Sequence, residues 1–68
     1  MVLFKTDRIK VTYTPLYDEV HHTEIPVYYV EDSENFFTLD TCPDLNEETL
    51  IQMMADYRLI RMEQIQNN

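Results

Sequence analysis

The sequence EETLIQMMADYRLIRMEQ, residues 47–64, places apolar side chains at the spacing of a long amphipathic helix. Its main apolar stripe consists of Leu50, Met53, Met54, Tyr57 and Ile60. These positions are three or four residues apart, so they share one side of a helix. Further apolar residues widen the stripe on adjoining faces: Ile51, Ala55, Leu59 and Met62. We therefore expect a helix from Glu47 to about Gln64, with an apolar arc wider than one face of a small sheet needs.

Two residues before this helix compete as its N-cap. Asp44 with Glu47 fits a capping box, in which a side chain from each end of the first turn satisfies a backbone amide. Asn46 as the cap instead puts Leu45 and Leu50 in the positions of a hydrophobic staple, and we prefer this arrangement.

Three segments upstream of the helix are typical of β-strands. Residues 8–14, RIKVTYT, alternate apolar and polar side chains, as a half-buried strand does. Residues 24–30, EIPVYYV, are the second expected strand, and residues 36–39, FFTL, the third. Proline donates no ladder hydrogen bond, so Pro26 is expected at a sheet edge or a bulge. Residues 15–23, PLYDEVHHT, are expected to form a long loop.

Strands that precede a helix without alternating with helices indicate an α+β fold. We expect a three-stranded antiparallel sheet packed by one C-terminal helix, in the order β-β-β-α, as a single domain over residues 1–68 with a frayed tail at 66–68. A competing interpretation ends the helix near Tyr57 and makes residues 59–65 a fourth strand. No glycine or proline separates those two parts, so this interpretation ranks second.

A chain of 68 residues has a thin core, because a domain of about 60 residues buries only about 60% of its unfolded surface. Such chains usually need a disulfide, a metal, a second copy or a partner. Cys42 is the only cysteine, which excludes a disulfide within the chain and favours a reducing, cytoplasmic setting. No apolar run approaches the length that spans a bilayer, and the first ten residues do not resemble a signal peptide.

Charge is strongly segregated along the chain. The net charge is −8, from 13 acidic and 5 basic residues. Residues 11–57 contain eleven acids and neither lysine nor arginine. The negative field of such a chain repels nucleic acid and anionic membrane surfaces, and it attracts a basic protein surface. We therefore expect a basic protein as the partner, and no direct contact with nucleic acid or membrane.

Ten acidic residues and two tyrosines are the candidate partner-binding residues: Asp18, Glu19, Glu24, Glu31, Asp32, Glu34, Asp40, Asp44, Glu47, Glu48, Tyr17 and Tyr28. Tyrosine is a favoured interface residue. Tyr28 is expected to share the less buried face of its strand with Val30, whereas Tyr13, Tyr29, Phe37 and Met54 are assigned to the core.

Carboxylates spaced like phosphates compete for the lysines and arginines that bind nucleic acid. The expected partner is therefore a basic, nucleic-acid-handling protein that this chain blocks or regulates. In size and charge alone, the chain resembles small acidic bacteriophage proteins that disable host machinery. The alternative is a structural or regulatory subunit that self-associates through its C-terminal helix, since the apolar arc there is wide.

Catalysis and cofactor binding find little support in the sequence. Glycine is absent, so no phosphate-binding loop of the familiar kinds is present. The adjacent His21 and His22 would point to opposite sides of an extended backbone, which disfavours a shared metal ion. Four acidic residues lie within six positions of Cys42, and their negative charge disfavours a reactive thiolate, so Cys42 is a poor nucleophile candidate. We expect no enzyme activity, no cofactor and no metal site.

Overall fold

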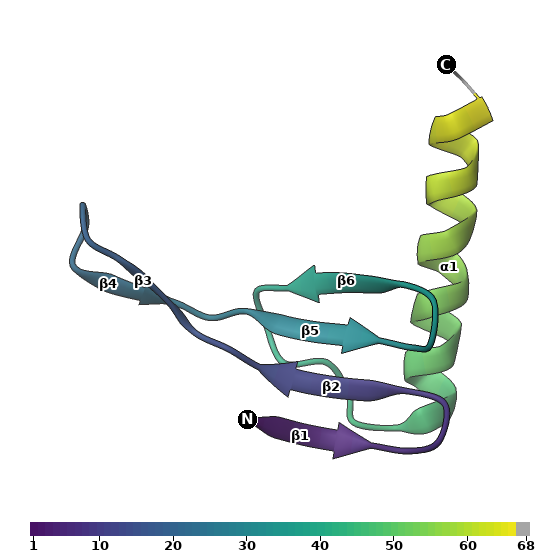
Figure 1. Ribbon diagram of the computed structural model, residues 1–68, viewed down its shortest axis with the longest axis horizontal. Helices are drawn as coiled ribbons and strands as arrows, with labels where there is room; N and C mark the ends of the chain where they lie inside the picture. Colours follow the sequence, from purple (N-terminus) through teal and green to yellow (C-terminus); the bar gives the residue numbers. More distant parts are fainter. Residues whose placement is uncertain (67–68) are drawn as a thin grey trace.

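The computed structural model describes residues 1–66 and contains six strands followed by one helix (Figure 1). The elements are β1 (Val2–Lys5), β2 (Lys10–Tyr13), β3 (Leu16–Asp18), β4 (Thr23–Ile25), β5 (Tyr28–Glu31), β6 (Phe36–Leu39) and α1 (Glu47–Gln66). Four strands form an antiparallel sheet in the order β1-β2-β5-β6, and β3 pairs with β4 in a separate two-stranded sheet. The α+β class and the single C-terminal helix are thus confirmed. The expected three-stranded sheet was wrong.

Strand β1 was not predicted, because its backbone is irregular. It pairs with β2 through Phe4 opposite Val11, but the register shifts between Val2 and Phe4. Such a bulge breaks the alternation of apolar and polar residues by which a strand is recognised in a sequence. Beyond the bulge the pairing continues to the first residue, since Tyr13 N donates a hydrogen bond to the carbonyl of Met1 at 2.8 Å.

The expected loop at residues 15–23 is instead part of one long hairpin. Tyr13 pairs with Tyr28 in the main sheet, and Leu16 pairs with Ile25 in the two-stranded sheet. The two pairings share one register, so β2–β3 and β4–β5 are the two sides of a continuous hairpin with its turn at residues 19–22. Figure 1 shows β3 and β4 projecting away from the four-stranded sheet, on the side opposite the helix. We call residues 16–25 the arm.

Two prolines mark the boundary between the sheet and the arm. The shared register places Pro15 opposite Pro26. The neighbouring pair is hydrogen bonded, with Thr14 N donating to the carbonyl of Val27 at 2.9 Å. Hydrogen-bonded and non-bonded pairs alternate in an antiparallel ladder, so the nitrogens of both prolines face outward. The prolines therefore leave the hairpin intact but cannot donate to an outer strand, and the main sheet ends there.

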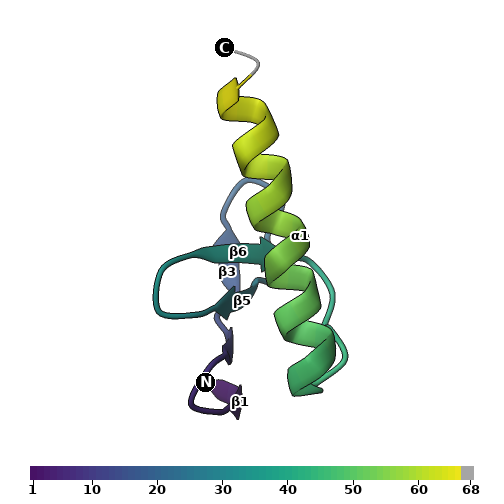
Figure 2. The same cartoon turned by 90° about the vertical axis from the view of Figure 1, so that its right-hand side faces the viewer.

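The core lies between the four-stranded sheet and the first half of α1. Its buried residues are Ile9, Val11, Val30, Leu50 and Met54. Partly buried residues pack around them: Leu3, Phe4, Phe37, Leu39, Met53 and Tyr57. The assignments of Met54 and Phe37 to the core are confirmed. Figure 2 shows the helix on one face of the sheet, which leaves the other face uncovered by it.

The second half of α1 extends past β6, the edge of the sheet (Figures 1 and 2). A helix of 20 residues is about 30 Å long, whereas four strands span only about 15–20 Å. As a result Leu59, Ile60 and Met62 are each more than half exposed. Ile60 therefore lies outside the core, although its spacing placed it in the main apolar stripe.

The face assignment in β5 was wrong. Val30 is fully buried and pairs with Val11, so Tyr28, two residues earlier, also faces the helix side. Tyr28 is half-buried there, with its ring centroid 4.8 Å from that of Tyr13. Tyr29 lies on the opposite face, 6.2 Å from the ring of Phe36. Both faces of this segment carry apolar residues, so its pattern does not determine the register.

The helix begins as predicted. The side-chain oxygen of Asn46 accepts a hydrogen bond from Thr49 N at 3.1 Å, which confirms Asn46 as the N-cap. The carboxylate of Glu47 instead accepts a hydrogen bond from the hydroxyl of Thr6 at 3.2 Å. The helix continues to Gln66, so the alternative of a fourth strand at residues 59–65 was wrong. Of the expected frayed tail, Gln66 belongs to the helix and residues 67–68 lie outside the described residues.

Replacing Met54 with alanine should lower the free energy of unfolding by about 2–5 kcal/mol, because it leaves a cavity in a core of few residues. Leu59→Ala is the matched control, since Leu59 is 59% exposed on the same helix and should change stability by less than about 0.5 kcal/mol. Urea unfolding followed by circular dichroism measures both. Equal effects of the two substitutions would contradict this placement of the core.

Candidate functional site

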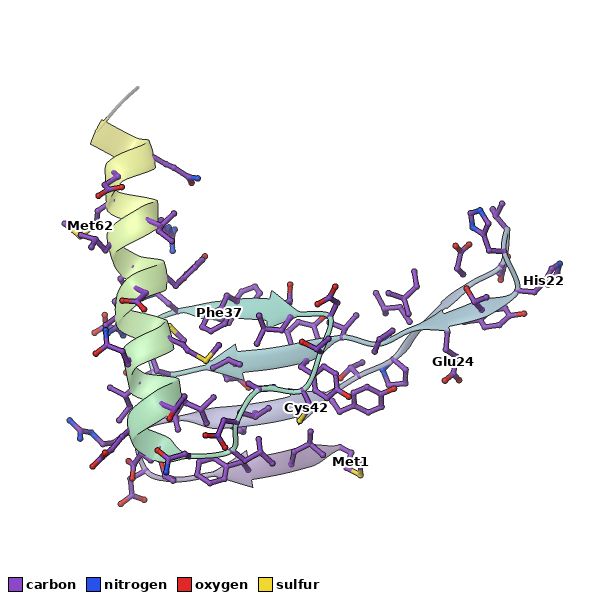
Figure 3. All side chains as sticks on the ribbon, turned by 180° about the vertical axis from the view of Figure 1, so that it is seen from behind. Met1, His22, Glu24, Phe37, Cys42 and Met62 are labelled. Carbon is purple, nitrogen blue, oxygen red and sulfur yellow. The ribbon has the colours of Figure 1, made fainter. Side chains whose placement is uncertain are left out.

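The acidic candidates fall into three regions of the fold and do not form one cluster. Asp18, Glu19 and Glu24 belong to the arm. Glu31, Asp32 and Glu34 lie at the opposite end of β5, where it turns into β6. Asp40, Asp44, Glu47 and Glu48 lie in the β6–α1 connection and the first turn of α1. Figure 3 shows the arm, with its labelled His22 and Glu24, well separated from Phe37 and the helix.

Two of the ten carboxylates are paired with cations in the fold. Glu31 lies 3.2 Å from the ammonium group of Lys10 on the neighbouring strand, where both side chains are partly exposed. Asp32 forms an ion pair with Arg58 of the helix. Lys10 and Arg58 flank the cation-free segment in sequence, and the fold brings them back to it. Local sequence could not reveal these pairs, because each joins residues more than twenty positions apart.

Asp32 organises the turn between β5 and β6 and ties it to the helix. Its Oδ1 accepts hydrogen bonds from Glu34 N at 2.8 Å and Asn35 N at 2.7 Å, while Oδ2 accepts one from Arg58. Arg61 adds a second link by donating to Asn35 Oδ1 at 2.9 Å. Burial alone would raise the pKa of Asp32, but the two backbone amides and Arg58 outweigh it and lower the pKa. Asp32 therefore links the β5–β6 turn to α1.

A side chain within the arm, that of Asp18, stabilises the turn at its tip. Asp18 Oδ1 accepts hydrogen bonds from Val20 N at 3.0 Å and His21 N at 3.4 Å, and Oδ2 lies 2.7 Å from the ring Nδ1 of His21. The hydrogen bond from the His21 ring is the main reason why the pKa of Asp18 is lowered. His22 closes the turn with a φ of 53°, in the left-handed region that histidine tolerates better than most residues.

The surface of the arm combines exposed apolar side chains with free carboxylates. Val20 at the tip is 82% exposed, and Tyr17 is 60% exposed. Leu16 and Ile25 are paired on one face of the ribbon and are also exposed. Glu19 and Glu24 are exposed, and the arm contains no lysine or arginine. The arm is thus a narrow, two-sided element that is both apolar and acidic.

Sequence reasoning placed Leu16 and Val20 in a loop and Ile25 in the second expected strand, and it selected none of them as a contact residue. A signal was nevertheless present, because LYD at residues 16–18 and TEI at residues 23–25 contain β-forming residues on either side of the more polar EVHH at residues 19–22. Tyr17, which was selected, lies on the exposed arm. Tyr28, the other selected tyrosine, lies on the helix side of the main sheet, where its ring packs against that of Tyr13 at a tilt of 39°.

The remaining acidic candidates surround the connection between the sheet and the helix. Asp40, Asp44 and Glu48 are exposed, while Glu47 is half-buried by its contact with Thr6. Cys42 of the same connection is also exposed. Within residues 1–66, no three histidine, cysteine or acidic side chains converge as a metal ion requires.

Asp32→Asn should reduce the pH dependence of stability. The folded chain lowers the pKa of Asp32 below its ordinary value of 3.8, so the charged form stabilises the fold above about pH 4. This contribution is lost as the pH falls through the lowered pKa. Urea midpoints should therefore fall less steeply below pH 4 for Asp32→Asn than for the unsubstituted chain, and Asp32→Asn should be less stable at pH 7.

Glu34→Gln is the control at pH 7, because Glu34 lies in the same turn with an exposed side chain and should keep the original stability. If the urea midpoints of Asp32→Asn and of the unsubstituted chain fell equally steeply below pH 4, a structural role for the Asp32–Arg58 pair would be contradicted.

In the part of the chain that the structure describes, α1 lacks the apolar character that a membrane-crossing helix requires. Comparisons with protein-family models, with curated protein sequences and with solved structures found no match to this chain.

Proposed function

We propose that this chain is a non-enzymatic binding protein whose arm occupies a basic site on a nucleic-acid-handling protein and thereby blocks or regulates it. The observation that carries the proposal is the arm itself. A ribbon of two strands extends from the sheet, presents apolar and acidic side chains, and contributes none of the buried core residues. Its exposed side chains are therefore available to contact another molecule.

The shape of the arm suits a groove that normally holds nucleic acid. Such grooves are lined by lysine and arginine because phosphates supply most of the affinity. Glu19 and Glu24 would meet those cations, and Tyr17 would lie against their apolar parts or against aromatic residues that otherwise stack on bases. Val20, at the tip, would enter first.

The overall charge supports the same kind of partner. A net charge of −8 on 68 residues speeds the encounter with a cationic surface and repels competing anions. The pairing of Glu31 and Asp32 inside the fold removes these two from the set of free carboxylates. The arm and the β6–α1 connection then carry most of the remaining candidates, and of these two regions the arm is the one that projects from the sheet (Figure 1).

The immobilised chain should capture a basic protein from a cell lysate at low salt and release it as salt rises. Double-stranded DNA or RNA added at constant salt should displace that protein, because both compete for one site. Capture that resists both salt and nucleic acid would contradict the proposal.

Glu19→Gln/Glu24→Gln should weaken capture of that protein at least tenfold, since both charges lie on the arm. Asp7→Asn/Glu63→Gln is the matched control, because it removes the same two negative charges from exposed positions elsewhere. Equal losses for the two pairs would show that overall charge acts and the arm does not.

A second candidate function is self-association through α1, which the exposed Leu59 and Met62 favour. These residues are three positions apart and share one face of the helix, and exposed apolar patches often mark contacts with another protein surface. Sedimentation at low micromolar concentration should then show a dimer that Leu59→Ser/Met62→Ser dissociates. A monomer at that concentration would contradict this candidate and leave the first unaffected.

A further inference from the structure

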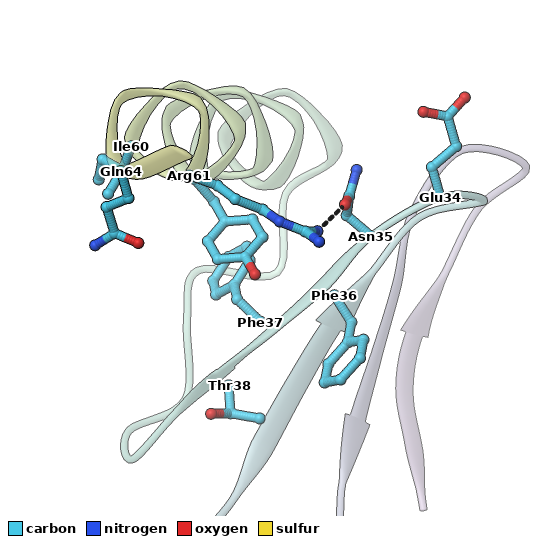
Figure 4. A pocket seen from close by; sticks show the side chains of 9 residues that line it. Glu34, Asn35, Phe36, Phe37, Thr38, Ile60, Arg61 and Gln64 are labelled. Carbon is cyan, nitrogen blue, oxygen red and sulfur yellow. Dashed lines mark hydrogen bonds between the residues drawn. The ribbon is translucent and has the colours of Figure 1, made fainter. Parts of the chain in front are cut away.

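A groove separates the projecting half of α1 from the free edge of β6. It has a volume of about 810 Å³ and is lined by Glu34, Asn35, Phe36, Phe37, Thr38, Tyr57, Ile60, Arg61 and Gln64. The helix residues that line the groove are three or four positions apart, so one face of the helix borders the groove. Figure 4 shows this face, with Ile60 and Gln64, beside the strand that carries Phe37 and Thr38.

The groove exposes backbone hydrogen-bonding groups along β6. Asp32 N donates to the carbonyl of Asn35 at 3.0 Å, so these two residues are a hydrogen-bonded pair of the β5–β6 ladder. Hydrogen-bonded and non-bonded pairs then alternate along the two strands. The backbones of Asn35, Phe37 and Leu39 therefore face β5, and those of Phe36 and Thr38 face outward. Within residues 1–66, β6 pairs with β5 alone. A further strand can thus pair with Phe36 and Thr38.

The apolar part of the groove lies on the helix side. Phe37 packs against Tyr57, with ring centroids 5.4 Å apart, and Ile60 remains 54% exposed one turn further along the helix. A strand paired antiparallel to β6 would place the side chain opposite Phe37 on this side, beneath Ile60. The groove therefore offers main-chain pairing and one apolar subsite, which is the combination used in recognition by strand addition.

The charges at the two ends of β6 determine which strand fits. Glu34 precedes the strand and Asp40 follows it, and both are exposed. Arg61, the cation of the groove lining, is hydrogen bonded to Asn35. We propose that this groove binds an extended peptide segment of another protein, with an apolar residue at its centre and a basic residue at each end.

A second copy of the chain fits this edge less well. The antiparallel register that uses Phe36 and Thr38 of both copies would place Glu34 opposite the second copy's Asp40, twice in each dimer. Like charges directly opposite one another destabilise strand pairs, and each copy also carries a net charge of −8. The same two acids attract lysine or arginine at the ends of a foreign strand. The proposal does not depend on the arm.

The peptide Lys-Val-Thr-Ile-Thr-Val-Lys, blocked at both ends and labelled with a fluorophore, tests the groove directly. Paired antiparallel to β6, it places isoleucine opposite Phe37, the threonines opposite Phe36 and Thr38, and the lysines opposite Glu34 and Asp40. Fluorescence anisotropy should show saturable binding that weakens as salt rises. The same peptide with glutamate at both ends should bind at least about tenfold more weakly.

Backbone methylation distinguishes strand pairing from charge attraction alone. In this register the threonine amides face β6 and the isoleucine amide faces solvent. N-methylation of the threonines should abolish binding, whereas N-methylation of the isoleucine should leave most of it. Equal binding of the two methylated peptides would overturn the proposal.

Variants of the protein provide the complementary test. Thr38→Pro removes an outward amide without removing a β5–β6 hydrogen bond, and Ile60→Ser removes the apolar cover. Each should weaken peptide binding about fivefold or more, with circular dichroism confirming that the fold persists. Ala55→Ser is the control, since Ala55 is an exposed apolar residue of the same helix that does not line the groove.

Glu19→Gln/Glu24→Gln should bind the peptide as the unsubstituted chain does, so failure of the arm proposal would leave this one standing. Peptide binding that survives both Thr38→Pro and Ile60→Ser would overturn the groove proposal. So would absence of binding at about 1 mM peptide, or a dimer that Thr38→Pro dissociates, because a second copy would then be the occupant.

Discussion

The pairing of Val11 with Val30 is the contact from which the rest of the structure follows. Both side chains are fully buried, so the register of the central hairpin is fixed by the core and a slip of one residue would expose them. This register puts Pro15 opposite Pro26, directs the arm away from the helix, and turns the outer backbone groups of β5 towards β6. One buried pair thus determines both the position of the arm and which backbone groups of β6 face outward.

The helix and its surroundings were largely predictable from the sequence. A stripe of apolar residues, an asparagine cap and two acids in the first turn act within a few residues of one another, and the fold keeps all of them. The burial of Leu50 and Met54 follows from that stripe. The exposure of Ile60 does not, because it depends on the width of the sheet beneath the helix, which local spacing does not encode.

The strands were less predictable, for two physical reasons. A bulge in β1 removed its alternation, and the apolar character of both faces of β5 left its register undetermined. The candidate acidic residues show a similar limit. A sequence gives the number of carboxylates, but Lys10 and Arg58 neutralise Glu31 and Asp32 only after distant segments meet. Glu19 and Glu24 of the arm are exposed, and within residues 1–66 neither forms an ion pair with lysine or arginine.

The absence of core residues from the arm has a consequence for how the chain can change over time. Substitutions between Leu16 and Ile25 remove no buried contact, so they carry little cost in folding stability as long as the turn can still close. The residues that would determine the choice of target are therefore different from those that stabilise the fold. Such a chain can acquire a new target, or follow a changing one, by altering a short ribbon while its small scaffold stays the same.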